Sequence, residues 1–198
     1  SYCWLDDPPK KYWRLPGTTR SGENSSLQEL EIALLQSVKL RMVSDVPLGA
    51  FLSGGIDSSL VVAMMQEQSG NPIRTFTLGF PSATHDEAAK ARKIAKHLGT
   101  DHLEHYVTAE EALEVVPQLP RFYDEPFADS SQIPTYLVCK LARRQVTVAL
   151  SGDGGDEVFA GYNRYLFAPK VWNLIRLIPL PLRDLLSTLL NRLPVHLL

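Results

Sequence analysis

The chain has 198 residues, of which 44% are hydrophobic and 21% charged, and its formal net charge is −2. These globular values exclude wholesale disorder, and a chain without a clustered basic face is not expected to bind nucleic acid. No apolar run of about 18 residues is present, so we predict no membrane contact through a spanning helix. The two cysteines, Cys3 and Cys139, fit no CxxC spacing, which favours a reducing, cytoplasmic setting.

The first helix signal follows residues 1–24, which are rich in proline, glycine and polar side chains and are predicted to lead into the domain. Ser26 and Glu29 have the spacing of a capping box, the pattern that begins a helix. Apolar side chains then recur at helical spacing as far as Met42, so one face of this helix should be buried. Pro47 closes the segment.

Apolar runs and helical patterns alternate along the rest of the chain. Strands are predicted at residues 48–52, 73–80, 102–107 and 145–150, and helices at 57–68, 86–98, 109–116, 132–144 and from Asp156. This alternation is typical of the α/β class, in which helices cover both faces of a parallel sheet. In such sheets, ligands bind beyond the carboxyl ends of the strands, at the point where the strand order reverses.

From Pro169 onward the composition shifts to leucine, isoleucine, proline and arginine. We therefore predict one ligand-binding domain at residues 25–168, followed by a helical C-terminal tail of the same domain at residues 169–198. Prolines break this tail into pieces too short for a membrane-surface helix. Apolar helices that lack a partner should self-associate, as in a homodimer, or remain disordered.

The first predicted strand is joined to its helix by the segment Ser53-Gly54-Gly55-Ile56-Asp57-Ser58-Ser59. Glycines let the backbone approach a ligand closely, and the free amides at a helix start bind anions. The three serines add hydroxyl donors. Asp57 would repel a phosphate unless it holds Mg²⁺, which takes carboxylate and phosphate oxygens together. The Walker A pattern is absent, and the alternative interpretation is a glycine turn with an aspartate helix cap.

A second glycine-rich turn, Ser151-Gly152-Asp153-Gly154-Gly155-Asp156-Glu157, follows the last predicted strand. Three acidic groups within five residues repel one another unless a cation lies between them. A divalent metal ion shared with Asp57 would explain their presence. The alternative is a solvated acidic turn that caps a helix.

The string SGGIDSS resembles the SGGxDS loop of the PP-loop ATP pyrophosphatases, a group that includes asparagine, GMP, NAD and argininosuccinate synthetases. These enzymes cut ATP between its α and β phosphates and leave AMP and pyrophosphate. The resemblance implies the adenine nucleotide α-hydrolase-like fold for residues 25–168. It also implies that residues 53–59 hold the pyrophosphate of ATP and that Asp57 ligates Mg²⁺.

Four further segments narrow the resemblance to the glutamine-dependent asparagine synthetases. They are RMVSDVPLG at residues 41–49, FTLGF at 76–80, YDEPF at 123–127 and SGDGGDEVFAGY at 151–162, within a match from about Tyr12 to Tyr165. By this resemblance, Leu52 and Leu78 contact adenine through backbone groups, while Ser151 and Gly152 contact AMP. Asp156 becomes the second metal-linked carboxylate.

Asp153 lies where some members of the family carry a glutamate tied to catalysis, so the resemblance implies a catalytic role for Asp153 beside Asp156. Its side chain is shorter than that glutamate by one methylene. The resemblance also implies an amino-acid substrate pocket formed by Asp124, Glu125, Asp129 and Ser130. The alternative is that Asp129 or Ser130 only caps the helix that follows.

The reaction implied is ATP-dependent amide formation, in which the carboxylate of aspartate is activated as an acyl-adenylate and ammonia then displaces AMP to form asparagine. Two alternatives remain open: another PP-loop synthetase with a different acceptor, such as a β-lactam synthetase-like enzyme, or a nucleotide-binding module without turnover. In the family, ammonia comes from glutamine through an N-terminal glutaminase domain, and a later basic region binds pyrophosphate. Since neither is seen in this sequence, we expect an incomplete site that makes no asparagine alone.

Overall fold

The structure is a computed structural model, and it describes residues 2–3, 10–11, 26–81, 87–125 and 128–190. The chain divides into two units, Ser1–Ser37 and Val38–Leu198, which we describe separately. In the first unit, strands β1 (Tyr2–Cys3) and β2 (Lys10–Lys11) form an antiparallel pair that the sequence did not predict.

Helix α1 (Leu27–Arg41) begins with the predicted capping box. The Ser26 Oγ accepts a hydrogen bond from the Glu29 backbone N–H at 3.1 Å, and the Glu29 carboxylate accepts one from the Ser26 N–H at 2.9 Å. These two bonds satisfy amides that the first turn of a helix leaves without partners. Of the apolar series along α1, Val38 is buried whereas Leu27 is exposed, so burial of a face is confined to its later turns.

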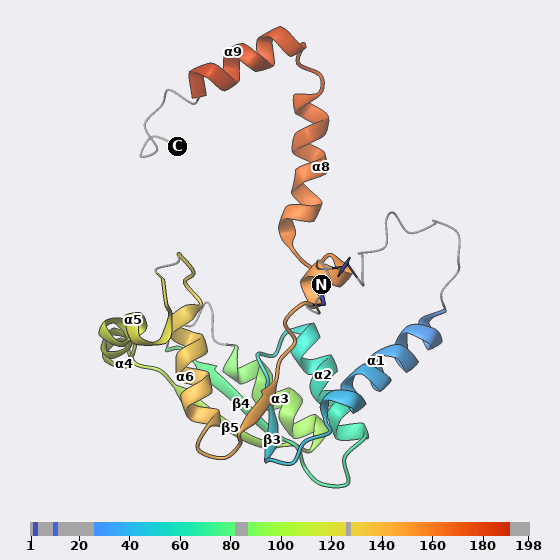
Figure 1. Ribbon diagram of the computed structural model, residues 1–198, viewed down its shortest axis with the longest axis vertical. Coiled ribbons are helices and arrows are strands. Elements are labelled where there is room, and N and C mark those ends of the chain that lie inside the picture. Colours follow the sequence, from blue (N-terminus) through green and yellow to red (C-terminus); the bar gives the residue numbers. More distant parts are fainter. Residues whose placement is uncertain (1, 4–9, 12–25, 82–86, 126–127, 191–198) are drawn as a thin grey trace. The chain divides into compact units, whose positions relative to one another are not determined.

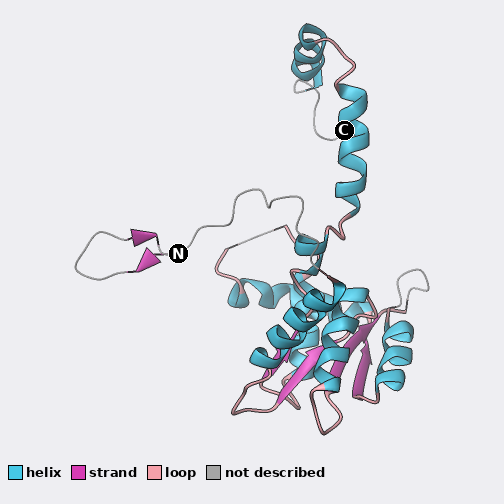
Figure 2. Ribbon diagram, turned by 90° about the vertical axis from the view of Figure 1, so that its right-hand side faces the viewer, coloured by secondary structure: helices cyan, strands magenta, loops and turns pink. Residues whose placement is uncertain are grey.

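The second unit is built on a parallel sheet (Figure 2), and its strand order is β5-β4-β3-β6. Its strands are β3 (Leu48–Phe51), β4 (Arg74–Gly79), β5 (Asp101–Tyr106) and β6 (Val148–Leu150). In the register, Gly49 lies between Arg74 of β4 and Ala149 of β6. β6 is shorter than predicted, because the amides of Gln145 and Val146 both donate to the Ala142 carbonyl and thus close the preceding helix.

The crossovers place helices on both faces of this sheet. Helices α2 (Ile56–Glu67) and α3 (Ala88–Leu98) each connect strands in the direction from β3 to β5. The return from β5 to β6 runs in the opposite direction, through α4 (Ala109–Val115), η1 (Val116–Gln118), α5 (Leu119–Phe122) and α6 (Gln132–Ala142). Because such crossovers are right-handed, α2 and α3 cover one face and α6 the other (Figure 1). The predicted α/β class is confirmed.

Residues on both faces of the sheet form the core. On one face, α3 presents Ala88, Ala91 and Ala95, which are buried at helical spacing and allow the helix to approach β4 and β5 closely. On the other, Leu141 and Ala142 of α6 pack with Phe76, which is 1% exposed. α3 ends at Gly99, whose left-handed conformation (φ 72°) suits a residue without a side chain.

The C-terminal helices are α7 (Gly155–Phe159), α8 (Asn163–Ile175) and α9 (Leu180–Leu190). α8 runs through Pro169, so the position predicted as the start of the tail lies inside this helix. Trp172 and Leu174 of α8 are exposed. In the part of the chain that the structure describes, no helix combines the length and apolarity that crossing a bilayer requires.

His102 of β5 is half-buried and holds an unusual set of contacts. Its Nδ1 shares a hydrogen bond of 2.9 Å with the Thr75 hydroxyl, which also bonds the Thr100 hydroxyl at 3.0 Å. Its Nε2 is buried and has no partner among the described residues. Burial lowers the pKa of His102 below its ordinary value of 6.5, because desolvation disfavours the imidazolium; nearby Glu104 opposes this shift.

Replacing His102 by Gln should make the free energy of unfolding less dependent on pH. With a lower pKa in the folded chain, the unfolded chain binds more protons between the two pKa values. The contribution of neutral His102 to the free energy of unfolding is therefore fully present above pH 6.5. It is lost as the pH drops from that value toward the lower pKa of His102 in the folded chain. Denaturant titrations between about pH 7.5 and about pH 5 should show an acid-side loss in wild type that is smaller in His102→Gln.

The matched control for this experiment is His97→Gln, because His97 is exposed in the last turn of α3. This variant should follow the wild-type profile. If wild type and His102→Gln lost stability in parallel toward low pH, the burial of His102 would not be responsible for the loss.

Candidate functional site

Two loops leave the carboxyl ends of the neighbouring strands β3 and β6. The first, residues 52–55, leads into α2, and the second, residues 151–154, leads into α7. The strand order reverses between β3 and β6, because the chain first builds outward to β5 and then returns to the other side of β3. This reversal creates the crevice in which open α/β sheets bind ligands. The structure thus places both predicted loops at one edge of the sheet.

The two loops contact each other through backbone atoms. A Cβ added to Gly152 would lie 2.6 Å from the Ser58 backbone nitrogen and 2.8 Å from the Asp57 carbonyl carbon. A Cβ added to Gly155 would lie 2.5 Å from the Asp57 carboxyl carbon. At Gly152 the atoms in the way belong to the backbone at the start of α2, so close approach requires glycine there, whereas at Gly155 they belong to the Asp57 side chain. The loops therefore form a single unit.

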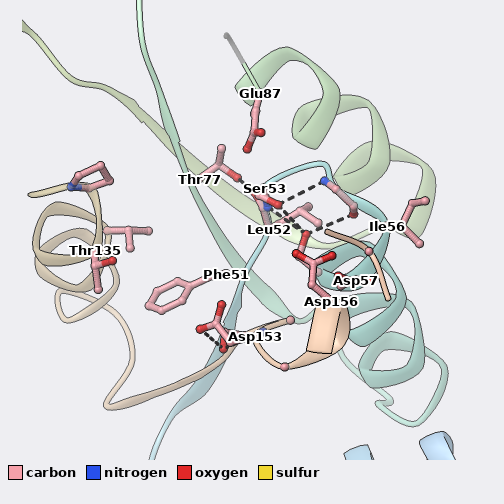
Figure 3. A pocket seen from close by; sticks show the side chains of 18 of the residues that line it. Phe51, Leu52, Ser53, Ile56, Asp57, Thr77, Glu87, Thr135, Asp153 and Asp156 are labelled. Atoms are coloured by element: carbon pink, nitrogen blue, oxygen red, sulfur yellow. Dashed lines mark hydrogen bonds between the residues drawn. The ribbon is translucent and has the colours of Figure 1, made fainter. Parts of the chain in front are cut away.

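A cavity of about 990 Å³ opens over this unit (Figure 3). Its volume lies at the upper end of the roughly 300–1,000 Å³ typical of small-molecule sites. Most of the predicted nucleotide residues line it: Leu52, Ser53, Gly55, Asp57, Ser58, Leu78, Ser151, Gly152, Asp153 and Asp156. Gly54 does not; at φ 78° it packs against Ala91 of α3. Nor does Ser59, whose hydroxyl donates to the Gly55 carbonyl at 2.6 Å.

The residues predicted for an amino-acid pocket, Asp124, Glu125, Asp129 and Ser130, do not line the cavity. The Asp129 carboxylate instead accepts a hydrogen bond from the Ser131 N–H at 2.8 Å, directly before α6. This bond lowers the pKa of Asp129. This contact is local to the loop, but it is not a helix cap, because α6 has Ser131 as its N-cap residue and no side-chain cap bond.

One side of the cavity is apolar. Phe51, Leu78 and Val138 line it, the last from α6 on the opposite side of the crevice. The Phe76 carbonyl accepts a hydrogen bond from the Leu52 N–H at 3.0 Å. Alternate residues of a strand direct their backbone groups to the same neighbouring strand, so Leu78, like Phe76, directs its N–H and C=O toward β3. Because β3 ends at Phe51, these two groups of Leu78 lie beyond the last paired residue of that strand. A flat base could bind there to the backbone of Leu78.

The other side of the cavity is polar and begins at the N-terminus of α2. The Ser53 and Ser58 hydroxyls lie 3.0 Å apart, and Ser53 Oγ also accepts a bond from the Gly55 N–H at 3.3 Å. Gly55 is the N-cap residue and supplies no side-chain cap. The first amides of α2 are therefore not capped by a side chain, as an anion-binding helix start requires.

Five carboxylates face this cavity, from Asp57, Glu87, Asp153, Asp156 and Glu157. Two of them have hydrogen-bond donors: Asp153 accepts from the Ser151 hydroxyl at 2.9 Å, and Glu157 accepts from the Tyr162 hydroxyl at 2.5 Å. The Tyr162 bond, followed by backbone donors at the start of α7 and by the charge of Arg164, lowers the pKa of Glu157.

The carboxylates of Asp57 and Asp156 differ, since neither side chain has a hydrogen bond or ion pair with another described residue (Figure 3). Asp156 is held in place from the C-terminal end of α7, where the N–H of Gly161 donates to its carbonyl at 3.1 Å. Among the described residues that line the cavity, none is Lys, Arg or His. The site therefore presents negative charge without a cationic side chain.

Several residues that line the cavity were not predicted from the sequence. Glu87 reaches the cavity from the start of α3, Thr135 and Val138 from α6, and Tyr162 from the turn before α8. Tyr162 ends the segment 151–162, which resembles the family. No local pattern in the sequence marks Glu87, Thr135 or Val138, because the crossovers of the sheet bring them to the crevice.

Together, the fold and the cavity define a parallel α/β domain with a ligand crevice at its topological switch point. A model of the family "Asparagine synthase" matches residues 29–197, and the chain belongs to this family. The resemblance inferred from the motifs is thereby confirmed.

The relatives are considerably longer than this chain. A protein from Methanocaldococcus jannaschii is 42% identical over 174 residues, covering 87% of this chain and 33% of that protein. Asparagine synthetase [glutamine-hydrolyzing] 1 from Bacillus subtilis is 41% identical over 143 residues, covering 72% and 22%. Among solved structures, an NH3-dependent NAD synthetase from Campylobacter jejuni is similar with a TM-score of 0.48 and 14% identity, covering 69% of this chain and 60% of that one, which is too little to establish a shared fold.

Substituting Gly152 by Ala should destabilise the chain by about 1–3 kcal/mol, because the new methyl group would overlap the backbone of Ser58 and Asp57. Gly70→Ala is the matched control, since a Cβ there would meet nothing within 4 Å. Urea denaturation of both variants measures the difference. A Gly152→Ala variant as stable as Gly70→Ala would show that the two loops are not packed as described.

Proposed function

We propose that this chain forms the ATP-using site of an asparagine-forming ligase. The single observation that carries the proposal is the pair of unpartnered carboxylates, Asp57 and Asp156, in the first turns of α2 and α7 at the switch point of an asparagine synthase family chain. The names of the curated relatives, which describe glutamine-hydrolysing asparagine synthetases, support the same reaction.

The proposal assigns ATP to the two sides of the cavity. The adenine base would lie on the apolar side and bind the backbone of Leu52 and Leu78, while Ser151 and Gly152 would contact the AMP portion. The pyrophosphate would lie over residues 53–59, where the uncapped amides of α2, its positive dipole end and the serine hydroxyls favour an anion.

Asp57 and Asp156 would hold Mg²⁺. Carboxylate oxygens are the hard ligands that this ion prefers, and both side chains lack other partners. The described residues contain no cluster of three or more potential ligands, so phosphate oxygens and water would complete the coordination. When bound, Mg²⁺ neutralises charge on the pyrophosphate.

In the proposed reaction, a carboxylate oxygen of aspartate attacks the α-phosphorus of ATP, and the bond from that phosphorus to the pyrophosphate breaks. Ammonia then attacks the acyl carbon, AMP leaves, and the nitrogen loses a proton to give asparagine. The chain's own contribution is to position the nucleotide and to balance charge. Asp153, held by Ser151 at the edge of the cavity, is proposed as a catalytic residue with Asp156.

Ammonia would come from glutamine, hydrolysed elsewhere in the longer protein. We also propose a cytoplasmic location, consistent with the free Cys139 thiol, and a homodimer, consistent with exposed apolar side chains on α8. A different acceptor is the main alternative, because Asp124, Glu125, Asp129 and Ser130 do not reach the cavity.

Substituting Asp57 or Asp156 by Asn should weaken ATP binding when Mg²⁺ is present and should not weaken it when Mg²⁺ is removed. With Mg²⁺ present, ATP should bind each variant about 10–100-fold more weakly than wild type, because a metal ligand is lost. With EDTA, ATP should bind at least as tightly as to wild type, because a charge that repels phosphate has been removed. Calorimetric titrations under both conditions measure the change.

Asp101→Asn is the control for these titrations, since Asp101 lies at the opposite end of the sheet in an exposed ion pair with Arg74. It should match wild type under both conditions. Equal affinity of wild type and Asp57→Asn in the presence of Mg²⁺ would remove Asp57 from the site.

The acceptor can be identified by exchange of labelled pyrophosphate into ATP, measured with the longer protein that contains this chain. Because acyl-adenylate formation is reversible and needs the acceptor, aspartate should start the exchange while glutamate and asparagine should not. Exchange that responds to another carboxylic acid and not to aspartate would contradict the proposed product while leaving the ATP site in place.

A further inference from the structure

Glu87 is a carboxylate of the cavity to which the proposed function gives no task. It directly precedes α3, and its side chain points into the cavity toward Thr77 and Ser53 (Figure 3). Its backbone carbonyl lies 3.2 Å from the position that a Cβ on Gly54 would occupy, so its main chain is fixed beside the first loop. Its side chain has no hydrogen bond or ion pair with another described residue.

The position of Glu87 falls between the two sides of the cavity. Leu52 and Leu78 belong to the side proposed for adenine, and Ser53 begins the loop proposed for the phosphates. In a nucleotide, the ribose connects these two parts. A nucleotide bound across the cavity therefore has its sugar beside Ser53 and Thr77, where the Glu87 carboxylate faces.

The Glu87 carboxylate can bind only certain chemical groups of a ligand. An ionised carboxylate only accepts hydrogen bonds, and its two oxygens can take two neighbouring hydroxyl groups at once. It repels phosphate, so it would not face that part of the ligand. An amino-acid ammonium is the other donor to consider, but the carboxylates of an amino acid would need a cation, and no described residue lining the cavity is Lys, Arg or His.

We propose that Glu87 binds the 2′- and 3′-hydroxyl groups of the ribose and thereby selects ribonucleotides over deoxyribonucleotides. This assignment rests on the proposed function, because it requires ATP in the cavity. The topology agrees with it: Glu87 follows β4, the strand beside the one that carries the phosphate loop. In dinucleotide-binding α/β folds, an acidic residue beyond the next strand takes the ribose hydroxyl in the same way.

The test pairs ligand analogues with variants of the full chain. Calorimetry with Mg²⁺ gives the affinities of ATP, 2′-deoxy-ATP and 3′-deoxy-ATP for wild type, Glu87→Gln and Glu87→Ala. Wild type should bind each deoxy analogue about 10-fold or more weakly than ATP, as expected for a lost hydrogen bond to a charged group. Glu87→Ala should bind all three nucleotides equally within about twofold, with ATP reduced to the level of the analogues. Glu87→Gln, which keeps one acceptor oxygen, should lie between.

Glu67→Gln is the matched control, because Glu67 is an exposed carboxylate at the far end of α2. It should keep the wild-type ratios, and thermal unfolding should show that all variants are folded. If Glu87→Ala kept the wild-type preference for ATP, or if wild type showed none, the ribose assignment would be overturned while the ATP site stood. If wild type bound no ATP, the proposed function itself would fall, and this assignment with it.

Discussion

The site depends on one packing constraint: two loop backbones touch where the strand order of the sheet reverses. Gly152 of the second loop leaves no space for a Cβ against the backbone of Asp57 and Ser58 in the first turn of α2, and Gly155, the first residue of α7, lies against the Asp57 side chain. This contact exists because β3 and β6 are direct neighbours in the sheet, with Gly49 opposite Ala149. For β6 to pair with β3, the chain must return from β5 by a long crossover through α6, on the opposite face of the sheet from α2 and α3. The topology, rather than either loop alone, brings Asp57 and Asp156 together.

The electrostatics of the cavity follow from this arrangement. Carboxylates crowded on touching loops repel one another, and the structure gives two of them donors: Ser151 for Asp153 and Tyr162 for Glu157. Asp57 and Asp156 keep their full capacity to bind a cation. Since the described lining holds no basic side chain, an anionic ligand is best accommodated as a metal complex. The selectivity of the site for its ligand would then depend on Mg²⁺ for the phosphates and, by our further proposal, on Glu87 for the sugar.

Local patterns were sufficient for the fold class, the capping box at Ser26, the end of α3 at residue 98 and the location of both glycine-rich loops, because each depends on neighbours in sequence. Features that depend on distant contacts were not predictable. The strand predicted from residue 145 begins only at Val148, because α6 uses the amides of Gln145 and Val146 to end its last turn. α8 continues through Pro169 although proline usually interrupts a helix. Glu87 and Val138 reach the cavity only through the crossovers, and Asp129, expected in a substrate pocket, bonds its own loop.

The central claim, that one metal–pyrophosphate unit is held between the two loops, is tested most directly by a crystal structure of the chain with Mn²⁺ and a non-hydrolysable α,β-methylene analogue of ATP. Mn²⁺ accepts the same hard oxygen ligands as Mg²⁺, and its anomalous scattering locates it without ambiguity. The account predicts that the ion contacts the carboxylates of Asp57 and Asp156 and the phosphate oxygens, with the β and γ phosphates over residues 53–59. An ion bound away from both aspartates, or phosphates outside the loop at the start of α2, would contradict it.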